Sequence, residues 1–420
     1  MSRPRYDIVI IGSGLGGLLT AALLSKEGKS VCILEKNRIP GGCLQSFSWK
    51  ERIFNTGIHY FGGLDEGKPL HRYWKYLGLT NLDCFEKIGD EAFDMISFQD
   101  KEFPLAPGKQ NFVDRLLPFF PKSGEILNGY VQTLEDITSR ISLYNLDVPK
   151  NEFSLEKSMN AWRFFNHFPD ETSVLPKVLS GNNFIYGGSR SDTPLYLAAV
   201  INHSFISGAW RISGGSSRIA DHLVSRLQSA GGELFPNQEV KGITKHHHGF
   251  SIKTASGEIF EADQVISAIH PSDSLKMING TEVRQVFSDR IQNLENTPSA
   301  LALFIALKPG SFRHFPYKIH HFPGHDTWYE QDFSDNEHFM LYTNPDANGA
   351  FATGAVVLTR DSMKDYAAWA DSTAENRPGE YREYKKQKAE RLLGQVENKF
   401  PGFRQHIEDF NISTPLTWKD

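Results

Sequence analysis

The sequence predicts an α/β fold in which a nucleotide-binding domain with a parallel sheet is combined with a second, discontinuous domain. Three observations lead to it. An unbroken apolar run at 8–11 is followed at once by a glycine motif at 12–17 and then by a helical pattern. A second apolar run at 31–34 ends in an acid, Glu35. The length of 420 residues allows two or three domains, each large enough to bury a core.

The first glycine motif predicts a tight turn that presents its backbone to phosphate. The run before it lacks polar alternation, as in a strand buried on both faces of a parallel sheet. Gly12 permits the turn, Gly14 lets the backbone approach a pyrophosphate, and Gly17 lets the following helix lie close to the sheet. The helix N-terminus would point free N–H groups at the phosphates. The predicted nucleotide contacts in this motif are Gly12, Ser13, Gly14, Leu15, Gly16 and Gly17.

Glu35 stands where a Rossmann-like domain places the acid that binds a ribose. It lies 23 residues after Gly12, at the end of the second strand. A glycine motif alone is a weak signal, whereas strand, glycines, helix, second strand and terminal acid in this order predict dinucleotide binding. The pattern does not by itself separate FAD from a nicotinamide cofactor. After it, Gly41 and Gly42 form a second glycine-rich loop that can wrap the other side of a pyrophosphate.

Two short motifs resemble a known family. Gly41-Gly42-Cys43 and the run Phe-Asn-Thr-Gly-Ile-His-Tyr at 54–60 resemble the flavin-binding region of the phytoene desaturase, carotenoid isomerase and retinol saturase family. Within it they are most similar to the retinol saturase-like members, and Cys43 stands where related amine oxidases often carry Arg.

The resemblance implies a Rossmann-like FAD-binding domain of the glutathione reductase and amine oxidase type, with FAD as cofactor and NAD(P)H as a candidate reductant. By this resemblance Val240 would hold the adenine through its backbone, and His59 and Tyr60 are the candidate catalytic pair beside the flavin. Besides Glu35 and the first motif, the expected FAD contacts are Lys36, Gly41, Gly42, Cys43, Thr56, Gly57, Ile58, His59 and Val240.

Changes of pattern along the chain divide it into alternating segments of two domains. Residues 90–176 are predicted to be helical, and the runs 299–307, 339–343 and 355–359 to be strands of an antiparallel substrate-domain sheet. Aromatic clusters at 116–121 and 162–168 are interpreted as helix core rather than as a tunnel or a bilayer contact. The expected segments are 1–85 and 206–275 for the FAD domain, 86–205 and 276–400 for the substrate domain, and 401–420 as the start of a C-terminal FAD-domain segment that is cut short.

Composition excludes several classes of protein. The formal net charge of −5, without a basic block, gives no electrostatic footprint for nucleic acid. Cys32, Cys43 and Cys84 match neither a disulfide framework nor a zinc site, so a reducing, cytoplasmic compartment is expected. The histidines at 246–248 alternate in direction along a strand and are not expected to bind one metal ion. No apolar run reaches transmembrane length. Peripheral membrane contact and the oligomeric state stay open.

The leading hypothesis is an FAD-dependent oxidoreductase that saturates, desaturates or isomerises double bonds of an apolar polyene, such as a carotenoid or retinoid. A flavin supplies the redox chemistry, so no Ser/His/Asp triad or paired carboxylates are needed. The alternatives are an amine oxidase-type flavoenzyme and a non-catalytic escort protein related to Rab GDP-dissociation inhibitors, which carries prenylated partners without a flavin. The complete dinucleotide pattern with Glu35 argues against the escort.

Overall fold

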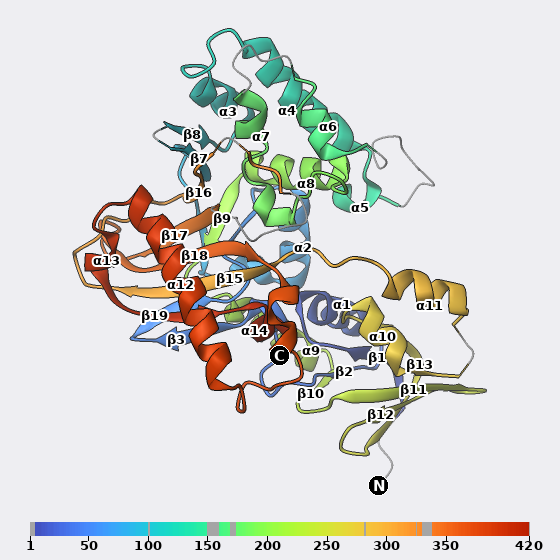
Figure 1. The fold of residues 1–420 in the computed structure, drawn as a ribbon. Helices are drawn as coiled ribbons and strands as arrows, with labels where there is room; N and C mark the ends of the chain where they lie inside the picture. The colour runs from blue at the N-terminus through green and yellow to red at the C-terminus, as the bar shows by residue number, and fades with distance from the viewer. Residues whose placement is uncertain are drawn as a thin grey trace. The chain divides into compact units, whose positions relative to one another are not determined.

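The computed structural model describes residues 5–99, 101–148, 159–168, 174–280, 283–324, 326–329 and 338–419. The chain forms two compact units, each made of three separate segments of sequence (Figure 1). Unit 1 consists of Met1–Tyr60, Arg72–Glu86 and Ile212–Asn296, and unit 2 of Phe61–His71, Lys87–Arg211 and Thr297–Asp420. Four elements contain or adjoin the points where the chain passes from one unit to the other: β5 (Tyr60–Gly62), α2 (Pro69–Leu77), β6 (Phe85–Lys87) and β9 (Ala209–Ile212).

A seven-stranded sheet is the centre of unit 1. Its order is β10 (Glu233–Phe235), β2 (Val31–Leu34), β1 (Tyr6–Ile11), β13 (Ile259–Ser267), β12 (Gly249–Thr254), β11 (Val240–His246) and β14 (Ile278–Asn279). The first four strands run parallel, and β12 pairs antiparallel with both of its neighbours. β1 lies between β2 and β13, which explains its unbroken apolar run and confirms the predicted strand.

The helix predicted after the first glycine motif is confirmed as α1 (Leu15–Lys26), and α9 (Ser217–Ser229) is a second helix of unit 1. Small residues, among them Gly17 and Ala21, lie on the buried face of α1 and allow close packing. The other elements of unit 1 are η1 (Gly42–Leu44), β3 (Ser46–Trp49), β4 (Arg52–Asn55), η2 (Leu79–Asn81), α10 (Pro271–Met277) and α11 (Gln285–Gln292).

One strand of this sheet is longer than the sequence indicates. The pattern predicts separate strands at 258–260 and 263–269, whereas the structure has the single strand β13. Its first half pairs with β12 and its second half with β1, so no turn is needed between them. The polar Asp263 in the middle is accommodated because its carboxylate accepts a hydrogen bond of 2.8 Å from Arg5 Nε.

A second seven-stranded sheet is the centre of unit 2. Its order is β19 (Ile407–Ser413), β15 (Ser299–Leu307), β18 (Ala352–Asp361), β17 (Phe339–Pro345), β16 (Lys318–Phe322), β7 (Asp94–Phe98) and β8 (Lys101–Leu105). The predicted strands 299–307, 339–343 and 355–359 are confirmed as β15, β17 and β18. All sheet neighbours pair antiparallel except β16 and β7, which run parallel.

The helix α12 (Gly379–Lys399) covers one face of this sheet (Figure 1). Its buried stripe, which includes Leu392 and Val396, packs on inward-facing residues such as Leu303 and Val357. The sequence predicts a pair of helices in 361–399, but before α12 there is only the 3₁₀ helix η5 (Met363–Trp369). The remaining elements of unit 2 are α3 (Lys109–Leu116), α4 (Gly124–Ser139), α5 (Ser142–Asn145), α6 (Ala161–Phe165), α7 (Leu175–Leu179), η4 (Asn183–Tyr186), α8 (Leu195–Ile206), α13 (Phe403–His406) and α14 (Pro415–Lys419).

Residues 90–176 are not purely helical, in contrast to the prediction. β7 and β8 form a hairpin there, with Gln99 at a φ of 45° in the turn. The aromatic clusters that follow belong to the core, as interpreted: Phe120 stacks on Phe103, and Phe165 packs on Tyr130. Phe119 is the exception in its segment, with 46% of its surface exposed.

Segment boundaries differ from the predicted ones in several places, and residues 206–211, predicted for the FAD domain, lie in unit 2. Residues 401–420, expected to begin a further segment of the FAD domain, lie in unit 2, where β19 pairs with β15 and Ile412 joins the apolar cluster. Residues 61–71 also lie in unit 2, whereas 276–296 lie in unit 1. Among the described residues, no helix has the length and apolarity to cross a membrane. Cys32 and Cys84 are buried and Cys43 is exposed.

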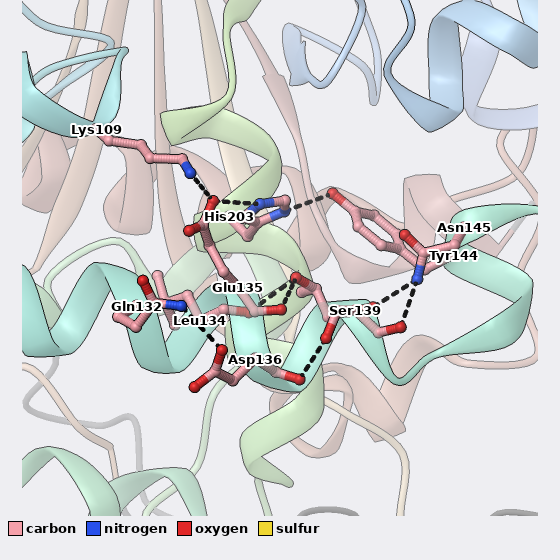
Figure 2. Close-up of polar contacts among 10 residues, drawn as sticks. Lys109, Gln132, Leu134, Glu135, Asp136, Ser139, Tyr144, Asn145 and His203 are labelled. Atoms are coloured by element: carbon pink, nitrogen blue, oxygen red, sulfur yellow. Dashed lines mark hydrogen bonds and ion pairs between the residues drawn. The ribbon is translucent and has the colours of Figure 1, made fainter.

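A polar network joins the helices of unit 2 around His203 of α8 (Figure 2). Its ring lies 3.0 Å from the hydroxyl of Tyr144 and 4.0 Å from the carboxylate of Glu135, which also pairs with Lys109. Burial lowers the pKa of His203 from 6.5 to about 4, with the positive charges of Lys68 and Lys109 acting in the same direction. Burial likewise lowers the pKa of His321 on β16 to about 4.

We expect acid to destabilise the protein through these two histidines. Because the unfolded chain takes up a proton near pH 6.5 and the folded chain only near pH 4, the free energy of unfolding falls as pH falls through this window, by up to about 3 kcal/mol for each histidine. Urea unfolding at pH 7, 5.5 and 4.5 measures this loss. His203→Gln should flatten the profile, whereas His247→Gln, on an exposed hairpin turn, should not. Equal slopes for wild type and His203→Gln would contradict the assignment.

Candidate dinucleotide-binding site

The glycine turn after β1 is held by close packing. Gly12 has a φ of +94°, and its N–H donates to the carbonyl of Leu34 at 2.9 Å. A Cβ on Gly12 would lie 2.7 Å from Ile269 Cγ2, and one on Gly17 would lie 2.0 Å from the Gly12 carbonyl oxygen. These two glycines are therefore required by the fold itself.

Gly14 differs from these two, because the space beside it is open. It is the N-cap of α1, and a Cβ built on it would meet no atom within 4 Å. No side chain caps this helix end, and its first turn contains no acid. A helix N-terminus with uncapped N–H groups and open space in front of it suits a phosphate. Gly16 is exposed and equally open, and Leu15 lies beside it in the first turn.

The second glycine loop lies directly against the first. The Gly41 N–H donates to the Ser13 carbonyl at 3.0 Å, and a Cβ on Gly42 would lie 3.2 Å from Gly14 Cα. Both Gly41 and Gly42 have positive φ, at 117° and 52°. The structure thus brings together the two loops that the sequence predicts to flank a pyrophosphate, and both are part of unit 1.

Glu35 is fixed at the end of β2 by the same turn. It is 7% exposed, and its Oε2 accepts hydrogen bonds from the Ser13 N–H at 2.8 Å and from Ser13 Oγ at 2.6 Å. Its Oε1 accepts one from the Asn37 N–H at 2.8 Å. A carboxylate offers about four acceptor positions, so one is left for a ribose hydroxyl. Lys36, next to it, is exposed.

Val240 starts β11 close to this acid. Two residues before it, the Gln238 N–H donates to the Glu35 carbonyl at 2.7 Å, and the Asn237 N–H donates to the Asn37 carbonyl at 3.2 Å. Val240 itself is buried, and the strand register shifts between it and Gly242. The backbone of this segment therefore runs beside the predicted ribose site, where an adenine would follow.

The Cys43 loop is joined to the segment after β4. Both the N–H and the Oγ1 of Thr56 donate to the Gln45 carbonyl, at 3.1 and 2.8 Å. A Cβ on Gly57 would lie 2.7 Å from Cys43 Cβ, so only glycine fits there. Ile58 follows and is half-buried.

His59 and Tyr60 are half-buried at the end of the first segment of unit 1. The structure places them four and five residues after Asn55, which ends β4 and contacts the start of α9. Their catalytic role stays a prediction.

Two site-building residues were missed by sequence reasoning. The Ser216 N–H donates to Asn55 Oδ1 at 2.8 Å, which joins the start of α9 to the end of β4. Ser216 is the N-cap of α9, but its side chain makes no capping hydrogen bond, and its Oγ donates to the Gln45 carbonyl instead. Asn55 lies in the Phe-Asn-Thr-Gly motif and Ser216 in Gly-Gly-Ser, but neither motif indicates by itself that the two residues meet.

Comparisons with known proteins find relatives that align with most of the chain. The all-trans-retinol 13,14-reductase of Danio rerio is 25% identical to the chain over 98% of its length and 75% of the relative's. The protein of the same name from Rattus norvegicus is 29% identical over 57% of the chain and 42% of the relative. Prolycopene isomerase 2 of an Oncidium hybrid cultivar is 25% identical over 98% of the chain and 73% of the relative.

Solved structures share the fold. Cyclohexylamine oxidase from Brevibacterium oxydans superposes with a TM-score of 0.63 at 16% identity, covering 98% of this chain and 84% of that one. The sequence also matches the profile of the flavin containing amine oxidoreductases over residues 15–394. That span covers most of both units, and the chain therefore belongs to the family of flavin containing amine oxidoreductases.

Proposed function

We propose that the chain binds FAD in unit 1 and uses it to saturate, desaturate or isomerise a double bond of an apolar polyene. The observation that carries the FAD assignment is the open space at Gly14, in front of the uncapped N-terminus of α1. A pyrophosphate there would accept the N–H groups of the first turn, with the second glycine loop on its other side. Glu35 would accept a ribose hydroxyl, and the segment leading to Val240 would flank the adenine.

Bound FAD supplies hydride transfer at its isoalloxazine ring. The chain has to orient the ring and exclude water from it. We assign these tasks to the motif around Thr56 and Gly57, which the Gln45 carbonyl and Cys43 hold in place, and to the adjoining His59 and Tyr60. NAD(P)H is proposed as the reductant.

The polyene class is supported by the names of the relatives. A retinol reductase and a prolycopene isomerase each align with 98% of the chain, and retinol and prolycopene are both apolar molecules with conjugated double bonds. Saturation is placed first because reductases are found among these relatives in more than one organism. The aromatic residues of unit 2 do not support the polyene assignment, because they fill the core of that unit.

If the protein also contacts a membrane, the exposed Phe119 is the apolar side chain of segment 116–121 that is available for this contact.

Turnover under anaerobic conditions tests this proposal. The flavin-loaded protein would be reduced with NADH, NADPH or dithionite and offered all-trans-retinol and lycopene isomers. In a parallel set the protein with oxidised flavin would be offered the same polyenes and amines, because desaturation and amine oxidation both need an oxidised flavin to accept the electrons. We expect a saturated or isomerised polyene and no amine oxidation. Oxidation of an amine, with every polyene recovered unchanged, would replace the proposal with the amine oxidase alternative.

A further inference from the structure

The two faces of the sheet in unit 2 differ in chemistry. The face covered by α12 is apolar. On the other face, strand alternation and register bring polar side chains from β7, β16 and β18, and from the residue just before β17, into the interior. These buried residues are one acid and four basic or titratable groups: Asp94, Lys318, His320, His338 and Arg360.

Arg360 on β18 is a buried cation that pairs with no acid among the described residues. It is 5% exposed, and no carboxylate of the described residues lies within ion-pair distance of it. Its Nη2 donates to Asn183 Oδ1, whereas its Nε has no hydrogen-bond partner. The rings of Tyr329 and Phe184 lie 4.8 and 5.5 Å from the guanidinium carbon. Burial lowers the pKa of Arg360 to about 10, although Tyr329 and Tyr186 act in the opposite direction.

The acid next to Arg360 in sequence does not compensate it. Asp361 points to the opposite face of the sheet, where it accepts hydrogen bonds from Lys388 Nζ at 2.6 Å and from the Tyr366 hydroxyl at 2.5 Å. Asp361 and Lys388 line a cavity of about 260 Å³ on the α12 side. The lining of that cavity also includes Arg360, but both of its acids, Asp361 and Asp365, pair with Lys388 and not with the guanidinium.

His320 is a second unsatisfied group on the same face. It is fully buried, and neither ring nitrogen makes a hydrogen bond, although Nε2 lies 3.4 Å from Asp94 Oδ1. Its ring stacks at 6.2 Å on His338, which in turn lies 5.3 Å from Phe184, one of the rings beside Arg360. The histidines therefore connect Arg360 to a wider region of buried polar groups.

We propose that Arg360 binds the carboxylate of the substrate, which is accordingly an unsaturated, apolar carboxylic acid; this inference rests on the proposed function. Removing a cation from water is costly unless an anion and hydrogen bonds replace the water, and one amide oxygen with two ring faces replaces only part of it. A guanidinium presents its N–H groups as a planar fork that matches the two oxygens of a carboxylate. The unpartnered Nε–H is one donor of that fork.

Binding of a matched acid and alcohol tests the inference without requiring turnover. The flavin-loaded protein would be titrated with all-trans-retinoic acid and with all-trans-retinol, and tryptophan fluorescence quenching followed. We expect wild type to prefer the acid by about 10- to 100-fold, the range expected for hydrogen bonds to a charged group. Arg360→Met should remove this preference and leave alcohol affinity unchanged. Arg360→Lys keeps the positive charge but loses the planar pair of donors. Its preference for the acid should therefore lie between those of wild type and Arg360→Met.

Thermal unfolding of the ligand-free variants separates binding from a structural role. Because no carboxylate in the described part of the chain pairs with the cation, Arg360→Met should keep or raise the melting temperature of wild type. The exposed Arg382→Met is the matched control and should change neither affinity nor stability. Equal affinity of wild type for acid and alcohol, or an unchanged preference in Arg360→Met, would overturn the carboxylate site and leave the polyene proposal standing. A large loss of stability in Arg360→Met would also overturn it. Failure of wild type to bind either ligand would overturn both the carboxylate site and the polyene proposal.

Discussion

Gly14→Val is expected to abolish flavin retention and to leave the fold intact. A Cβ at this position meets no protein atom, so the folded chain can accommodate the side chain. The space that it fills is the one in front of the α1 N-terminus, where a pyrophosphate would lie. Flavin absorbance per mole of purified protein measures retention, and circular dichroism with thermal unfolding measures the fold.

Two glycine variants serve as controls for this result. Gly17→Ala should lower stability severely, because its Cβ would lie 2.0 Å from the Gly12 carbonyl oxygen. Gly129→Val, at an open position inside α4 of unit 2, should keep its flavin. Stoichiometric flavin in Gly14→Val would show that the cofactor lies elsewhere.

Glu35→Gln is expected to weaken flavin affinity by about 10- to 100-fold, because a charged acceptor for the ribose becomes a neutral amide. Part of the effect is indirect. The introduced amide group would face the Ser13 N–H and hydroxyl with fewer acceptor positions than the carboxylate has, at a cost of about 1–3 kcal/mol. Titration of the flavin-free protein with FAD measures the affinity.

The control for Glu35→Gln is Glu239→Gln, an exposed acid of unit 1 that pairs with Lys241 at 2.6 Å. It should bind FAD as wild type does. If Glu35→Gln also binds FAD like wild type, then Glu35 is only a structural acceptor for Ser13 and Asn37.

The elements that the sequence predicted best are those whose signals are local. The buried run of β1, the glycine turn, α1 and Glu35 follow one another closely in sequence, and each is confirmed in position. β15, β17 and β18 were also found, because each is a continuous apolar stretch.

The sequence predictions were wrong where pairing between strands far apart in the sequence determines the structure. β7 pairs with β16, which lies far away in sequence, and its short mixed sequence shows no local strand pattern. β13 continues through polar residues because β12 and β1 supply partners along its whole length. Residues 407–413 join unit 2 because β15 offers an open edge there.

In the candidate site, too, the features with local sequence signals were predicted and those that depend on long-range contacts were not. The two glycine loops were predicted as separate motifs, and the structure adds that Gly42 lies against Gly14. The roles of Asn55 and Ser216 were not predicted, since their hydrogen bond joins positions 161 residues apart. Arg360 gave no signal in sequence, because an arginine in a strand is ordinary until the structure shows that it is buried.

The most direct test of the account is the cofactor content of the purified wild-type protein. The arrangement of Gly14, Gly42 and Glu35 predicts a yellow protein with one FAD per chain, or a colourless one that takes up added FAD to that stoichiometry. A colourless protein that also refuses added FAD would contradict the assignment of unit 1 as a flavin site.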